Sequence, residues 1–121
     1  RVRIDLEDVP SGFDDFPRLI QGVAVRVRDV CEGNWPGLAD FAEQLWKAFL
    51  AHVFGTAVYA ELVGLEEEEA AVWAAGLHAV ANEWMGGPED EADVLLSYGL
   101  TDRDRRAWKR VCRRIRAVFQ A

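Results

Sequence analysis

The sequence contains few of the residues on which metal and covalent chemistry usually depend. It has two cysteines and two histidines among 121 residues, and Ser11 and Ser97 are its only serines. Neither serine lies in a G-x-S-x-G turn, and neither histidine has a carboxylate or another histidine one helical turn away. No glycine-rich phosphate loop is present. The sequence therefore predicts no catalytic residue, no metal and no cofactor, and it favours a protein that is not an enzyme.

Long apolar stretches are also missing. No uncharged run is longer than the 13 residues of 48–60, a length that is too short for a membrane span but suits a buried helix. We therefore expect no membrane partner. Cys31 and Cys112 fall on apolar faces of the predicted helices, which is typical of buried thiols in a reducing compartment. This cysteine usage predicts a cytoplasmic location.

The composition supplies the material for one helical domain. Half of the residues are hydrophobic and five are tryptophan, which is enough for a core in a chain of this length. The pattern predicts an all-α fold, a compact bundle of four or five helices over residues 13–121. In the extended segment 1–12, Val2, Ile4 and Leu6 alternate with charged residues, as in a β-strand. That segment is an edge strand, a clip against the bundle or a flexible leader, and the sequence leaves these alternatives open.

The first expected helix, within 13–32, is the ambiguous one. Ile20, Val23 and Val27 share one helical face, which favours a helix. Val23, Val25 and Val27 also alternate with Arg26 and Arg28, as in a strand, and β-branched residues prefer strands. We favour the helix. The remaining helices are expected at 38–60, 65–85, 88–99 and 101–121.

The helix at 38–60 is the most apolar one, and we expect it to be central, with a kink at Gly55. His52 lies within its uncharged run, which indicates a buried histidine with a satisfied hydrogen bond. Four residues of the C-terminal helix are expected to pack against it: Trp108, Val111, Ile115 and Phe119.

The C-terminal segment 101–121 is the most informative part of the chain. Its apolar residues share an arc of about 120° on a helix, and its basic residues lie on the other side. The segment holds eight basic and two acidic residues, whereas the other hundred hold six basic and nineteen acidic, so a segment of charge +6 belongs to a body of charge −13. The candidate partner-binding residues are Arg105, Arg106, Lys109, Arg110, Arg113, Arg114 and Arg116, with Trp35 and Trp84, which lie next to helix breaks, as candidate interface anchors.

The basic face has three interpretations. It is a solvated surface that neutralises the acidic body, a site for nucleic-acid phosphates, or a docking surface for an acidic protein or a second copy of this chain. Arginine favours a protein partner, because its guanidinium binds a carboxylate through two parallel hydrogen bonds. We therefore expect a non-enzymatic accessory or regulatory protein that acts through protein–protein interaction or self-association. The alternative is a nucleic-acid-associated subunit that uses the same face, including as the second helix of a helix-turn-helix.

The stretch EDEADVLLSYG, 89–99, resembles the MazG family of all-α nucleotide pyrophosphohydrolases. In that family a pair of carboxylates precedes an aliphatic run, and an earlier helix supplies a second acidic cluster. Here Asp90 and Asp93 stand for the pair, with Asp90 where the family has Glu, and 66–69 stand for the earlier cluster. Ala70 and Ala71 stand where the family has a further carboxylate. The resemblance implies a Mg²⁺-dependent nucleotide hydrolase. The same acids are also typical of helix N-termini, which they stabilise through the helix dipole.

Overall fold

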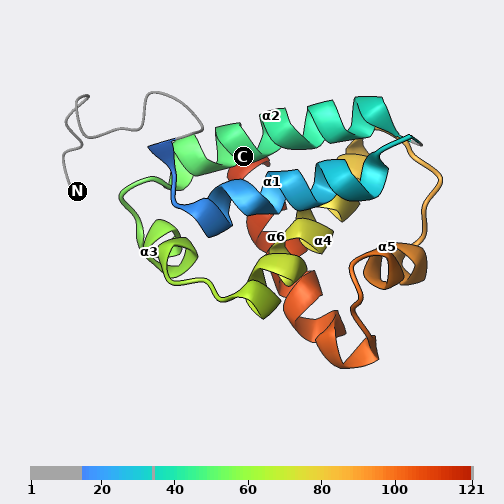
Figure 1. Cartoon of the computed structure of the whole chain (residues 1–121). Helices are drawn as coiled ribbons and strands as arrows, with labels where there is room; N and C mark the ends of the chain where they lie inside the picture. The colour runs from blue at the N-terminus through green and yellow to red at the C-terminus, as the bar shows by residue number, and fades with distance from the viewer. Residues whose placement is uncertain (1–14, 34, 121) are drawn as a thin grey trace.

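The structure, a computed structural model, describes residues 15–33 and 35–120, and these form an all-α bundle (Figure 1). The predicted fold class is confirmed. The N-terminal segment 1–12, with its strand alternative, lies outside the described residues. No helix in the described part is long and apolar enough to cross a membrane. The elements in chain order are α1 (Arg18–Cys31), α2 (Pro36–Val53), α3 (Ala57–Val63), α4 (Glu67–Trp84), α5 (Glu91–Ser97), a 3-10 turn (Asp102–Asp104) and α6 (Arg105–Phe119).

The ambiguous first segment is a helix, as we favoured from the sequence. Helix α1 buries Ile20, Val23 and Val27 on one side, while Val25 is 52% exposed. A strand would have placed Val25 on the same face as the other two valines. The helix begins directly after Pro17, whose fixed φ angle suits a helix N-terminus.

The long apolar segment forms two helices, α2 and α3, instead of one kinked helix. Gly55 has a φ angle of +81°, a left-handed conformation that glycine adopts without steric cost. The N–H of Phe54 closes the last turn of α2 on the carbonyl of Leu50 at 2.9 Å. This break explains why the described residues contain six α-helices where four or five were expected.

Helix α4, and not α2, is the central helix, so the expectation for 38–60 was wrong. Helix α4 contacts α1, α2, α5 and α6, and its buried residues lie around most of its circumference. It is rich in alanine, and small side chains allow neighbouring helices to approach it from several directions. Helix α2 keeps an exposed side that includes Lys47 and His52. The prediction of a buried His52 was therefore also wrong.

Three aromatic rings fix α2 against α4 and α1. Trp46 stacks on Phe49 with 5.4 Å between ring centroids, and it meets Trp73 of α4 at 5.8 Å. The indole N–H of Trp46 donates to the carbonyl oxygen of Ile20 in α1 at 2.8 Å. Its one polar group is thus satisfied inside the core, which is the usual condition for burying a tryptophan.

Helix α6 crosses α4 at a close contact. A Cβ atom on Gly76 would lie 2.4 Å from Cγ1 of Val111, so only glycine fits there. Trp108, Val111 and Ile115 are buried, as predicted. Their main support is α4, however, and α2 makes a smaller contact with α6. The prediction was wrong for Phe119, which is 37% exposed because it is the last residue of the helix and extends past the core.

Candidate functional site

The arginine face is the side of α6 opposite its buried residues. Three of its arginines form ion pairs with carboxylates of α3, α4 and α5, and these pairs fasten the edges of the helix to the acidic body. They contribute little stability individually because they are partly exposed to solvent. The pairs are Arg105–Glu91 at 3.0 Å, Arg114–Glu61 at 2.8 Å and Arg116–Glu83 at 2.9 Å.

The other five basic side chains of this region make no ion pair or hydrogen bond with any part of the chain that the structure describes. All five are exposed to solvent. Their charges are therefore available to a binding partner, whereas those of the three paired arginines are already used. We call these residues the unpaired cations: Arg103, Arg106, Lys109, Arg110 and Arg113.

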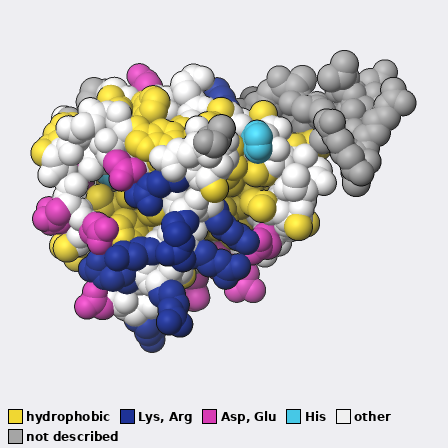
Figure 2. Space-filling view, turned by 180° about the vertical axis from the view of Figure 1, so that it is seen from behind, with side chains coloured by type: hydrophobic (Ala, Val, Ile, Leu, Met, Phe, Trp, Pro, Cys, Tyr) yellow, Lys and Arg dark blue, Asp and Glu magenta, His cyan; other side chains and the backbone are white. Residues whose placement is uncertain are grey.

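Figure 2 shows the basic side chains as a band across one face of the molecule, with carboxylates along its border. The band affects its neighbours electrostatically. The pKa of Glu61 is lowered, mainly by its hydrogen bond from Arg114, with a smaller contribution from the charge of Arg110. The face is thus a strongly positive strip within a molecule of net negative charge.

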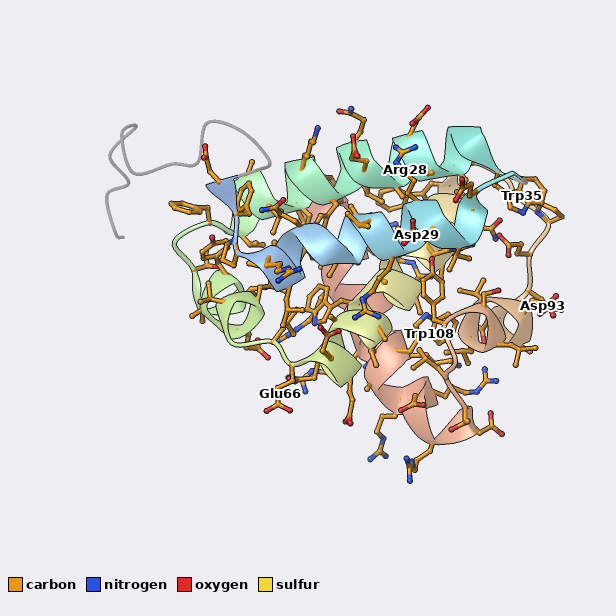
Figure 3. All side chains as sticks on the ribbon, in the orientation of Figure 1. Arg28, Asp29, Trp35, Glu66, Asp93 and Trp108 are labelled. Atoms are coloured by element: carbon orange, nitrogen blue, oxygen red, sulfur yellow. The ribbon has the colours of Figure 1, made fainter. Side chains whose placement is uncertain are left out.

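The two predicted tryptophan anchors do not belong to this band. Trp35 directly precedes α2 and is 41% exposed, and Figure 3 shows it where α1 ends and α2 begins. Trp84, the last residue of α4, is half-buried and meets Phe119 edge to face at 5.8 Å. The structure therefore brings the seven basic candidates together on α6, places Trp84 at the C-terminal end of that helix, and leaves Trp35 elsewhere.

A cleft of about 390 Å³ lies between α4, α5 and α6, and it borders the unpaired cations. Its walls carry opposite charges. The end of α4, the loop before α5 and the first residue of α5 supply carboxylates, while α6 supplies Lys109, Arg113 and Arg116. Trp108 and Val94 contribute apolar surface to the same cleft.

Trp108 carries a buried N–H without a partner. The side chain is 2% exposed, and its Nε1 atom is the buried side-chain atom for which no hydrogen-bond acceptor is found in the described part of the chain. Figure 3 places this residue between α6 and α5. A buried donor left without an acceptor costs roughly 1–3 kcal/mol, so an acceptor brought to this position would be stabilised.

A second cluster of polar side chains, which the sequence did not reveal, lies at the core of the molecule around His78. Its Nε2 atom is 2.7 Å from Glu89 Oε1, and its Nδ1 atom is 2.8 Å from the hydroxyl of Tyr98. Cys31 lies on the same side, with Sγ 3.9 Å from Nδ1. The alanines next to His78 in the sequence indicate that it is buried. Its partners could not be predicted, because they lie 11 and 20 residues further along the chain, beyond the spacing of contacts within one helix.

The Cys31–His78–Glu89 arrangement has the composition of a nucleophilic triad but not its electrostatics. Burial raises the pKa of the Cys31 thiol to about 11, with a further contribution from the charge of Glu89. A thiol of this kind is almost wholly protonated at neutral pH, whereas a nucleophilic cysteine needs a lowered pKa. The hydroxyl of Tyr98 also occupies the histidine nitrogen that would accept the thiol proton. Cys31 and Cys112 are free, buried thiols, as predicted.

The acids that resemble those of the MazG family lie at two separate helix N-termini. Glu69 accepts a hydrogen bond from the N–H of Glu66 at 3.0 Å, and Asp90 accepts one from the N–H of Asp93 at 3.0 Å. Figure 3 shows Glu66 and Asp93 on opposite sides of the molecule. Among the described residues, no three histidine, cysteine or acidic side chains are grouped so that they could hold a metal ion. These carboxylates cap helices, as the second interpretation of the sequence proposed.

Comparison of the chain with protein-family models, with curated proteins and with solved structures gives no match. The arguments about function therefore rest on the geometry of this chain.

Proposed function

We propose that this chain is a small, non-enzymatic accessory protein that docks on an acidic protein surface through the unpaired cations of α6 and of the turn before it. The observation that carries this proposal is the division of the arginine face into paired and unpaired charges. The sequence holds 21 acidic residues, so carboxylates are abundant. A face that served only to neutralise the body would have its central cations paired as well as its edges. Instead the edges are fastened and the centre is left exposed.

A protein partner fits this face better than a nucleic acid does. The band is bordered by the carboxylates that hold its edges, and the molecule has a net charge of −7. These negative charges repel a phosphate backbone within a Debye length of about 8 Å at physiological salt. A protein surface can present a few carboxylates to the centre of the band without bringing further negative charge to its border. Four of the five unpaired cations are arginines, which bind carboxylates through paired hydrogen bonds.

The test is capture of partners from a native lysate at about 50 mM and about 500 mM salt. The parent chain is compared with R106E/R110E/R113E and with a control, R18E/R28E/K47E, which changes the net charge by the same amount on exposed positions of α1 and α2. We expect the parent and the control to retain the same protein at low salt and to lose it at high salt. The α6 variant should retain nothing specific.

Two outcomes would contradict the proposal. If all three chains capture the same proteins, the face is only a solvated surface. If the parent retains RNA or DNA and the bound protein is lost after nuclease treatment, the face binds phosphates. Light scattering at the same two salt concentrations identifies a second copy of this chain as the partner if the parent dimerises and the α6 variant does not.

A further inference from the structure

The cleft beside the unpaired cations contains hydrogen-bond donors that have no partner in the described residues. Its walls bring four carboxylates and three cations together around Trp108. Which of these groups already has a partner within the molecule decides what a ligand could bind.

Each of the four carboxylates in the cleft wall already has a contact within the molecule. Two pair with arginines of α6, one pairs with the buried histidine, and one caps α5. Asn82, which is 8% exposed, donates its side-chain N–H to the carbonyl of Glu89 at 3.0 Å and so holds the acidic loop against α4. The carboxylate contacts are Glu83–Arg116, Glu91–Arg105, Glu89–His78 and Asp90 with the N–H of Asp93.

The side chains of the cleft wall that have no such contact are donors. Lys109 and Arg113 line the cleft and belong to the unpaired cations. Trp108 adds the buried N–H that has no acceptor in the described residues. The donors of the cleft wall without a partner in the described residues are thus two positively charged side chains and one neutral N–H, and such donors match a ligand oxygen that carries negative charge.

We propose that this cleft binds a carboxylate group, with Lys109 and Arg113 as its counter-charges and the Trp108 indole as a hydrogen-bond donor. The inference rests on the proposed function, since the carboxylate is the Asp or Glu side chain of the acidic partner that inserts beside α6. A singly charged carboxylate fits better than a phosphate, because a dianion would be repelled more strongly by the four carboxylates of the opposite wall. The site would act as the specificity pocket of an otherwise electrostatic interface.

Nuclear magnetic resonance on the full chain tests this inference without the partner. The probe is N-acetylglutamate α-amide, which carries one side-chain carboxylate. The controls are N-acetylglutamine α-amide and inorganic phosphate, all at matched ionic strength. We expect the indole N–H resonance of Trp108 to move downfield and saturate with the glutamate compound, while the other four indole resonances stay in place. The glutamine compound should have no effect, and phosphate should act more weakly.

A matched pair of variants connects the signal to the cleft. K109Q/R113Q should weaken binding of the probe about tenfold, because it removes both charge-assisted contacts. R106Q/R110Q removes the same charge from cations that do not line the cleft, and it should change the affinity by less than about twofold. All four positions are exposed, so folding should be preserved in both variants.

The inference is overturned if the Trp108 resonance does not move at saturating probe, or if phosphate or the glutamine compound moves it as far as the glutamate compound does. An equal loss of affinity in both variants would also overturn it. These failures are distinguishable from failure of the proposed function. If only the cleft inference fails, the cleft binds no carboxylate, but the partner complex is still lost when the charges of Arg106, Arg110 and Arg113 are reversed.

Discussion

The Nε2 atom of His78 lies 2.7 Å from Oε1 of Glu89, and this contact joins the middle of α4 to the loop that precedes α5. The histidine is fully buried, and the side chain of Glu89 is only 16% exposed. Burial raises the pKa of Tyr98, so its hydroxyl stays protonated, and it forms a hydrogen bond with Nδ1 of His78. A carboxylate only accepts hydrogen bonds, so Nε2 of His78 is the donor in its contact with Glu89.

Removal of Glu89 should destabilise the fold. The change Glu89→Ala leaves the buried Nε2 of His78 without an acceptor, and we expect the free energy of unfolding to fall by about 1–3 kcal/mol. Urea unfolding followed by circular dichroism measures this change. The control is Asp29→Ala, which removes an exposed carboxylate of α1 and should shift stability by less than about 0.5 kcal/mol. Equal unfolding midpoints for the two variants would show that the His78 contact does not support the fold.

Two glycine-to-alanine changes should act in opposite directions. At Gly76 a new Cβ would clash with Val111 at 2.4 Å, so Gly76→Ala should force α6 away from α4 and cost about 1–3 kcal/mol. At Gly22 nothing lies within 4 Å of a new Cβ. Gly22→Ala in α1 should therefore stabilise the chain by about 0.5–1 kcal/mol. Thermal unfolding of both variants measures these changes. An unchanged unfolding temperature for Gly76→Ala would contradict the close contact between α6 and α4.

Truncation of the buried tryptophan of α6 should be far more costly than truncation of its terminal phenylalanine. Trp108 is 2% exposed, so Trp108→Ala should cost about 3–5 kcal/mol, enough to unfold many domains of this size. Phe119 is 37% exposed, so Phe119→Ala should lower the free energy of unfolding by clearly less. If Trp108→Ala melted like the parent, α6 would be a detachable tail and not part of the core.

The buried thiols make stability depend on alkaline pH. Burial raises the pKa values of Cys31 and Cys112 from about 9 to about 11. Folding thus favours the protonated thiols, so their contribution is fully present below pH 9 and is lost as pH rises towards 11. Urea midpoints measured from pH 8 to pH 10.5 should fall for the parent. The fall should be smaller for C31A/C112A, and identical slopes would contradict the assigned cause.

Helical periodicity correctly predicted the helices that have one buried face and one face exposed to solvent. The apolar stripe of α1 and the two-sided pattern of α6 are of this kind, because one helix pattern fixes which residues face the core. The same logic failed for His52. An uncharged run shows that a helix can be buried, but it does not show which sides its neighbours cover. The small side chains of α4 allow other helices to pack around it, and they were the better indication of which helix is central.

The candidate site was predictable only in outline. The sequence identified the basic residues of α6, since their clustering is visible in one segment. It could not separate the paired Arg105, Arg114 and Arg116 from the unpaired cations, because their partners lie 14, 53 and 33 residues away. The cleft and the cluster around His78 were invisible for the same reason. Both are made by side chains that only tertiary packing brings together.

Site-specific photo-crosslinking in the source cells tests the central proposal most directly. A benzophenone amino acid is placed at Ala107, an exposed residue one helical turn from both Arg103 and Arg110, so that every cation of the face is kept. The control position is Ala51, exposed on α2. We predict one discrete crosslinked product from position 107 that contains an acidic protein, is absent from position 51, and disappears in R106E/R110E/R113E. A product that contains RNA or DNA, or a product that survives the triple reversal, would contradict docking of an acidic protein on the unpaired cations.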